Sequence, residues 1–267
     1  MMRSFVLIIF LLTTFFSPTL VASAHDLLPK EIVTYLHNHP NATPEEIQSY
    51  AQTQGGETAQ KFQDKVEIIR LIKNQQTSVL DNAYDFLKLG VGHILSGSDH
   101  ILFVLSLLLV FISLSEILKL TGTFTIAHSI TLILSALGLI TVSTRVSEPL
   151  IAFSIAFVAI STVFYGNSRF VGGEKSKLAT VFFFGLFHGM GFAGLLREIA
   201  IPSDKFISSL FAFNIGIEIG QLIIISFALP LILLFRKKPW YPKVIKVFAI
   251  IIALLALYWV IQRIFFV

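Results

Sequence analysis

Six ionisable side chains able to bind a metal ion stand inside long apolar stretches of this sequence. They are four histidines, one aspartate and one glutamate: His93, Asp99, His100, His128, His188 and Glu218. An ionisable group in an apolar segment long enough to cross a membrane is costly, so each of them is a functional-site hypothesis. Imidazoles and carboxylates suit a borderline divalent cation, and the chain has no cysteine to offer instead. The residue types therefore predict a path or a site for a transition metal.

His93, Asp99 and His100 form an H-x5-D-H motif. On a regular helix, seven residues at a rise of 1.5 Å separate the two histidines by about 10 Å, too far for both to hold one ion. Ser96-Gly97-Ser98 lies between them, and Gly and Ser tolerate non-helical backbone. The motif predicts either two successive metal sites along one helix or one site on a broken helix, and the sequence leaves both open.

His128 and His188 stand on two further apolar segments, and each has a second interpretation. A single histidine in a membrane helix often serves as a hydrogen-bond partner between helices. His188 lies between Gly185 and Gly189, whose small-xxx-small spacing predicts close helix packing. Such packing would place the imidazole against another helix, but it does not explain why a histidine stands there.

Four more polar residues are weaker candidates for the same metal chemistry. Asn214, Glu218 and Gln221 are spaced i, i+4, i+7 and so share one helix face, where the two amides could equally hold helices together. Glu148 opens an apolar segment and could serve a metal site or only cap a helix. His25 would offer an α-amine and an imidazole as a chelating pair if the chain were cleaved before it.

The composition indicates a membrane protein. Of 267 residues, 55% are apolar and 13% charged, against roughly 45–50% and 25% in soluble domains. The mean hydropathy is +0.80. These values exclude a disordered chain and an ordinary cytosolic enzyme. Long unbroken apolar runs predict helices and not barrel strands, so we expect an all-α polytopic membrane bundle.

The chain divides into three parts by composition. Residues 1–24 resemble a cleaved signal peptide, with Arg3, an apolar core and a small-residue cleavage site at Ala22-Ser23-Ala24. Residues 25–88 carry many charges and predict a small extracytoplasmic helical segment, with one helix starting at Pro44 and a second over 64–73. Residues 89–267 predict a domain of six transmembrane helices, over 89–113, 122–141, 147–166, 178–196, 206–235 and 244–264.

The basic residues predict the orientation of these spans. With the N-terminus outside, the loops on the cytoplasmic side carry nine lysines and arginines, and the opposite side carries four: Arg145, Arg197, Lys205 and Arg263. This bias agrees with the positive-inside rule. Basic loops of this kind report orientation and do not predict nucleic-acid binding. The expected partners are a metal ion and the lipid bilayer, and a homo-oligomer is compatible with the sequence.

Four stretches resemble the HupE/UreJ family of bacterial membrane proteins, which is associated with nickel or cobalt uptake. They are the H-x5-D-H motif, Phe124-Thr125-Ile126-Ala127-His128-Ser129, Phe187-His188-Gly189 and Phe213-Asn214-Ile215-Gly216-Ile217-Glu218. The resemblance covers roughly residues 84–235. It implies a multi-pass protein of the bacterial inner membrane in which His93, Asp99 and His100 take part in nickel transport. The charged stretch before the first span makes the chain look more like the second, less characterised branch of the family.

Together these observations predict a permease that moves nickel or cobalt inward. His93 would be the first ligand near the outer surface, and Asp99 with His100 would hold the ion deeper. His128, His188 and Glu218 would supply partner ligands or hydrogen-bond acceptors. The sequence has no G-x-x-x-x-G-K-[ST] motif for ATP.

Two alternatives to transport stay open at this point. Histidines and an aspartate buried in a helical bundle could hold zinc and activate water, which would make the protein an intramembrane zinc-dependent hydrolase. Ser96, Ser98 and Ser129 could assist such a reaction. The third alternative is a metal sensor or maturation partner that transports nothing.

We predict that reporter fusions placed after Lys177 and after Lys238 both lie in the cytoplasm, because the basic loops follow the third and fifth spans. Fusions to a reporter active only in the cytoplasm, paired with one active only outside it, measure this directly. An extracytoplasmic signal at either position would contradict the six-span topology.

Overall fold

The computed structural model describes residues 35, 38, 39, 42, 44–53, 78–110, 113–165, 173–198 and 204–265. All regular elements in these ranges are helices, which confirms the all-α prediction. They are α3 (Pro44–Thr53), α6 (Val79–Ser96), α7 (Ser98–Val110), α8 (Leu114–Ala136), α9 (Thr144–Tyr165), α10 (Glu174–Glu198), α11 (Phe206–Phe235) and α12 (Tyr241–Phe265). The expected signal peptide, His25 and the expected helix over 64–73 lie outside the described residues.

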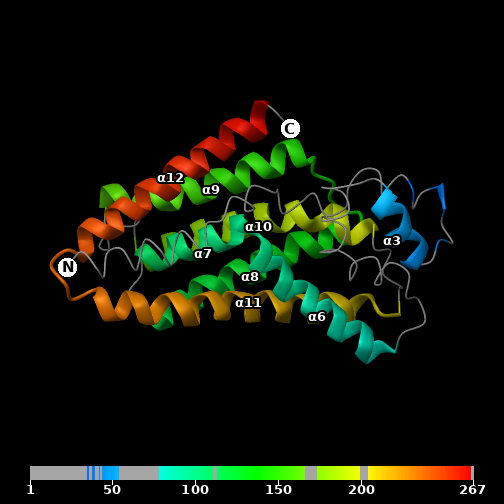
Figure 1. The fold of residues 1–267 in the computed structure, drawn as a ribbon. Coiled ribbons are helices and arrows are strands. Elements are labelled where there is room, and N and C mark those ends of the chain that lie inside the picture. The colour runs from blue at the N-terminus through cyan, green and yellow to red at the C-terminus, as the bar shows by residue number, and fades with distance from the viewer. Residues whose placement is uncertain are drawn as a thin grey trace.

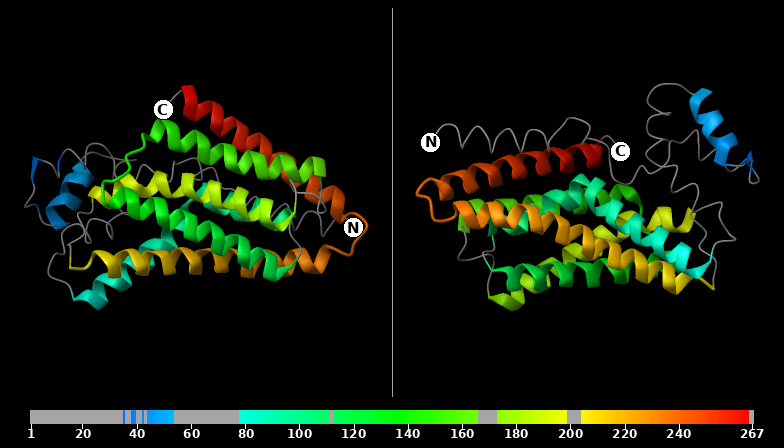
Figure 2. Two further views of the ribbon diagram at one scale, coloured as in Figure 1. Left: turned by 180° about the vertical axis from the view of Figure 1, so that it is seen from behind. Right: turned by 60° about the horizontal axis from the view of Figure 1, so that its bottom comes forward.

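Helices α6 to α12 lie side by side in an elongated bundle, and α3 lies beyond one end of it (Figures 1 and 2). The helices pack most closely in three pairs: α8 with α10, α6 with α11, and α9 with α12. Helix α7 occupies the middle and contacts helices of all three pairs. A residue of α7 can therefore meet side chains from every pair, which makes this helix the natural place for a shared site.

The surface of the bundle is apolar and its interior carries polar groups. Ile207 is 82% exposed and Phe227 71%, whereas His128 and His188 are fully buried. Four helices are long and apolar enough to cross a membrane: α8, α9, α11 and α12. The pair α6–α7 adds a fifth if its two halves count as one span. Helix α10, the remaining expected span, does not meet this criterion within the described residues, so the six-span count stays a prediction.

The first span begins earlier than the expected residue 89. Helix α6 starts at Val79, with the Ser78 hydroxyl accepting a hydrogen bond from the backbone N–H of Asp81 as a cap. Asn82, buried one turn later, donates from its amide to the Ser209 hydroxyl at the start of α11. The helix extends past the apolar run with Ser78 and Asp81 exposed, and only Asn82 is buried against α11, which a hydropathy pattern does not reveal.

This first span is broken at Gly97. The residue has φ −76° and ψ 100°, an extended conformation, and α6 and α7 meet there at a bend of 68°. A Cβ atom at this position would collide with the carbonyl oxygen of His93 and the imidazole of His100. The single expected helix over 89–113 is therefore two half-helices, and the glycine leaves room for the two histidines beside the bend.

Glycines set the closest helix crossings. In the α6–α11 pair, a Cβ at Gly90 or at Gly216 would run into the backbone of the partner helix. In the α8–α10 pair, Gly185 and Gly189 meet backbone atoms of α8, which confirms the predicted close packing of these two residues. Small residues let helix backbones approach in this way without a hydrophobic driving force from water.

Two ion pairs join the N-terminal ends of α8 and α10. The Nζ of Lys119 lies 2.8 Å from a carboxylate oxygen of Glu174, and the Nζ of Lys177 lies 2.8 Å from one of Glu116. The hydrogen bond and the positive charge of Lys119 hold the pKa of the exposed Glu174 carboxyl below its usual range. Lys119 and Lys177 are two of the nine basic residues expected on the cytoplasmic side, and they lie at the same end of the bundle.

We predict opposite effects for the same substitution at two glycines of α6. Gly90→Ala should destabilise the bundle by about 1–3 kcal/mol, because the added methyl meets the Phe213 carbonyl of α11. Gly92→Ala, two residues away in open space, should leave stability unchanged or raise it by about 0.5–1 kcal/mol through helix propensity. Thermal unfolding of the detergent-solubilised variants compares the two. Equal effects would contradict a close α6–α11 crossing.

Candidate metal site

Three histidines from three helices converge beside the break at Gly97. His93 comes from the last turn of α6, His100 from the first turn of α7 and His128 from α8. Their potential ligand atoms all lie within 4.8 Å of one another, and all three residues are buried. The ring centroids of His93 and His100 are only 4.5 Å apart. The helix is thus broken between His93 and His100, and the break brings the two imidazoles together, as one site on a broken helix would require.

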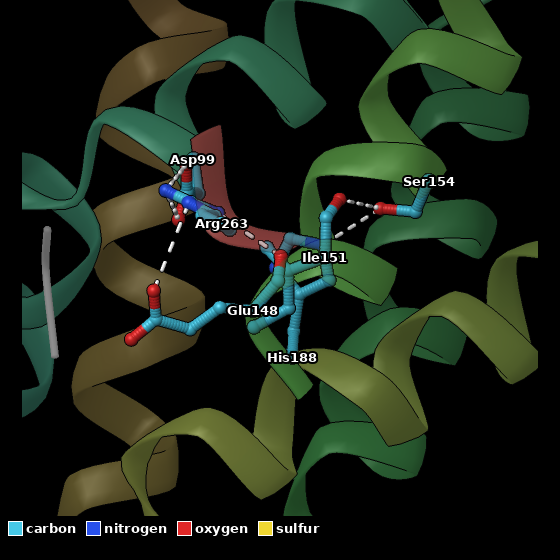
Figure 3. Close-up of polar contacts among 6 residues, drawn as sticks. All are labelled: Asp99, Glu148, Ile151, Ser154, His188 and Arg263. Atoms are coloured by element: carbon cyan, nitrogen blue, oxygen red, sulfur yellow. Dashed lines mark hydrogen bonds and ion pairs between the residues drawn. The ribbon is translucent and has the colours of Figure 1, made fainter. Parts of the chain in front are cut away.

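His188 of α10 joins this histidine group from the side. Its ring centroid lies 4.9 Å from that of His100, and it is fully buried. The Nε2 atom of His188 is 3.0 Å from the Ser154 hydroxyl of α9, which itself donates to the carbonyl of Ile151 at 2.6 Å (Figure 3). Because the Ser154 hydroxyl proton is already donated to the Ile151 carbonyl, the Nε2–H of His188 donates and the Ser154 oxygen accepts. A neutral His188 then carries its basic lone pair on Nδ1.

Phenylalanine rings enclose the four imidazoles. The Phe192 ring lies 4.2 Å from His93 between centroids, and Phe103 and Phe124 lie 5.0 and 5.1 Å from His188. All three phenylalanines are about 1% exposed. Such a shell excludes water and lowers the local dielectric, which strengthens bonds to a bound cation but also requires that its charge be balanced nearby.

Asp99 points away from the histidine group and into an ion pair with Arg263. One terminal nitrogen of the Arg263 guanidinium, Nη2, lies 3.0 Å from both carboxylate oxygens of Asp99 (Figure 3). Successive residues of a helix point about 100° apart, so Asp99 and His100 of α7 face different neighbours. The sequence hypothesis that both hold one ion therefore does not match this arrangement, in which Asp99 faces α12.

Glu148 at the start of α9 completes this charged cluster. Its backbone carbonyl accepts a hydrogen bond from Nη1 of Arg263 at 3.1 Å, and its carboxylate lies 3.8 Å from Nε. Asp99, Glu148 and Arg263 are 1%, 5% and 6% exposed. Two carboxylates and one guanidinium leave a formal charge of −1. This ion cluster ties α7, α9 and α12 together, and removing one partner of a buried pair typically costs about 3–5 kcal/mol.

The polar face of α11 meets α8 and not the histidine group. The Thr125 hydroxyl donates to the Gln221 amide oxygen at 3.2 Å, and the Ser129 hydroxyl donates to that of Asn214 at 2.6 Å. Asn214 and Gln221 thus hold two helices together, the second interpretation that the sequence allowed. Glu218 lies half-buried on the same face, outside the group of ligand atoms formed by the three histidines.

Sequence reasoning missed two residues that the structure brings to the site. Arg263 was counted among the basic residues of the outer side, although an arginine in the last turn of an apolar segment is itself a sign of a buried partner. Ser154 stands among apolar residues of α9 with nothing in its spacing to single it out. Only the position of α10 beside α9 shows that this hydroxyl orients His188.

The model of a family described as HupE / UreJ protein matches residues 70–263, which is more than half of the chain. The matched range includes the four histidines, Asp99, Glu148 and Arg263. No curated protein and no solved structure matches the chain.

We predict that Ser154→Ala weakens cobalt(II) binding by on the order of 10–100-fold, the usual effect of removing a group that orients a metal-binding histidine. Ser106→Ala is the matched control, because Ser106 is equally buried and bonds only to a carbonyl of its own helix. Isothermal titration of both purified variants measures the difference. Equal affinities would contradict the assignment of Ser154 to His188.

Proposed function

The chain belongs to the HupE/UreJ family, which is associated with nickel and cobalt transport, and we propose that it is a permease that carries nickel or cobalt across the membrane. The substrate ion binds to His93, His100 and His128, with His188 as a fourth ligand. The observation that carries this proposal is the convergence of these imidazoles at the break between α6 and α7. Imidazole nitrogens suit nickel, copper, zinc and iron, with cobalt next to nickel in the order of affinities.

The first half-helix, α6, supports cation binding through its dipole. The C-terminal end of α6, which carries the negative end of a helix dipole, points toward the histidine group. Asp99 stands in the first turn of α7, where the positive end of the dipole favours a carboxylate. Broken helices at the substrate site are a recurring feature of secondary transporters, because non-helical backbone is tolerated where it lines a site.

The buried ion cluster supports the proposal through its net charge. A divalent cation among neutral imidazoles in a low-dielectric interior needs negative charge nearby. Asp99, Glu148 and Arg263 together supply a charge of −1 within the same bundle, beginning at the residue next to His100. The negative charge of the cluster therefore lowers the free-energy cost of placing the cation in the bundle. The cluster does not have to coordinate the cation to do so.

The membrane potential is sufficient to drive inward transport. A divalent cation that crosses 100 mV gains about 4.6 kcal/mol, twice the value for one charge. Because the cytoplasm is the negative side, the potential sets the inward direction, and the basic loops predict that the N-terminus lies outside. The protein would then act in the bacterial inner membrane as a facilitator, with its charged N-terminal segment outside.

A zinc-dependent hydrolase is the second candidate, because three histidines are also the ligand set of some catalytic zinc sites. The observation favouring it is that three imidazoles form a complete group at 4.8 Å without a carboxylate. Ser154, the serine in contact with His188, does not add a nucleophile, since its proton is directed to a backbone carbonyl. A hydrolase would retain one zinc ion per chain through purification.

We predict that His93→Ala, His100→Ala and His128→Ala each reduce uptake of radioactive nickel and cobalt by at least about tenfold, to a similar degree, because the three imidazoles hold one ion. Uptake is measured in cells that contain equal amounts of each variant in the membrane. His39→Ala serves as the control, since His39 is exposed and stacks on Tyr35 far from the bundle interior.

Two outcomes would contradict this function. Undiminished uptake in His100→Ala would remove the histidine group from the transport path. Absence of nickel and cobalt uptake by the wild type, together with one zinc ion per purified chain, would favour the hydrolase.

A further inference from the structure

Arg263 holds a carboxylate that stands one residue away from a proposed metal ligand. Asp99 and His100 are neighbours in the chain, so their Cα atoms are about 3.8 Å apart. Nevertheless the group of ligand atoms within 4.8 Å contains histidines only. Both oxygens of Asp99 instead contact Nη2 of Arg263, which comes from the far end of the chain on α12. The guanidinium thus determines which way this carboxylate faces.

Resting on the transport function above, we propose that Arg263 is a positioning residue that determines metal specificity. By binding the Asp99 carboxylate, Arg263 keeps it out of the coordination sphere and leaves a site made of imidazoles alone. Carboxylates suit magnesium, calcium and manganese, whereas imidazoles suit zinc, copper and nickel. An all-imidazole site therefore discriminates against the harder cations.

The local structure allows Asp99 to turn once Arg263 is removed. Helix α7 begins at Ser98, directly after the extended residue Gly97, so Asp99 lies in a first turn whose backbone N–H groups lack partners within the helix. Glu148, the other carboxylate at Arg263, stands on α9, which contributes no ligand atom to the three-histidine group. Asp99 is accordingly the carboxylate that Arg263 controls.

The contacts of Arg263 also distinguish this positioning role from that of a latch, meaning a residue that only links helices. Its Nη2 contacts Asp99, while Nη1 and Nε face the carbonyl and the carboxylate of Glu148. A latch between helices would influence stability and all metals alike. A residue that controls the Asp99 carboxylate instead changes the ratio of the affinities for hard and borderline metals, and this ratio can be measured.

The test compares Arg263→Gln, Asp99→Asn/Arg263→Gln and the wild type, each purified in detergent and titrated with manganese(II) and nickel(II). In Arg263→Gln the released carboxylate should raise the manganese-to-nickel affinity ratio by on the order of 10–100-fold. The absorption spectrum of bound cobalt(II) should shift in the same variant, because an oxygen ligand joins the nitrogens.

The double variant provides the decisive control. It removes one positive and one negative charge, so the ion cluster keeps its formal charge of −1, and replacing a buried pair as a unit is far better tolerated than breaking it. With no carboxylate at position 99, its metal ratio and cobalt spectrum should equal those of the wild type. This comparison holds even if Arg263→Gln alone fails to fold.

Each remaining outcome overturns one idea. An unchanged ratio in a folded Arg263→Gln would make Arg263 a latch only. A double variant that loses nickel affinity or changes the cobalt spectrum would show that Asp99 is itself a ligand in the wild type, and would overturn the specificity role. A wild type that binds neither nickel nor cobalt would instead refute the proposed function on which this inference rests.

Discussion

The interruption of the first span at Gly97 is the constraint on which the site depends. A continuous helix would separate His93 and His100 by about 10 Å along its axis, whereas the 68° bend brings their rings to 4.5 Å. The bend is tolerated because the bundle shields it: α11 packs against both half-helices, and Gly97 places no side chain in the space that the two imidazoles need. The same glycine therefore both breaks the helix and makes room for the site.

The polar interior falls into two groups with different tasks. The histidine group is enclosed by phenylalanines and gathers imidazoles from α6, α7, α8 and α10. The ion cluster of Asp99, Glu148 and Arg263 is charged and connects α7 to the α9–α12 pair. Because Asp99 and His100 are adjacent in sequence, α7 belongs to both groups. A movement of α12 relative to α7 would therefore displace Asp99, which is bonded to Arg263 of α12 and is next to the proposed metal ligand His100.

Most of the fold was predictable because lipid imposes simple rules on sequence. Apolar runs long enough to cross a bilayer predicted helices at α8, α9, α11 and α12, and the Gly185–Gly189 spacing predicted close packing of α10. The start of α6 was placed ten residues late, because Asn82 is a polar residue that only its hydrogen bond to Ser209 allows to be buried. Asp99 was expected to bind the metal with His100; in the structure its carboxylate pairs with Arg263, 164 residues away in the chain.

The sequence by itself supplied the residue types of the proposed site: four histidines and two acidic residues in apolar segments, without cysteine, predict a borderline divalent cation. Helix periodicity also placed Asn214 and Gln221 correctly on one face. Only the tertiary structure shows that the His93 and His100 rings lie together, that Ser154 hydrogen-bonds to His188, and that Asp99 pairs with Arg263. The physical reason is that helix periodicity relates residues within one helix, whereas the pairing of buried charges depends on which helices pack together, and that choice is made by side chains far apart in the chain.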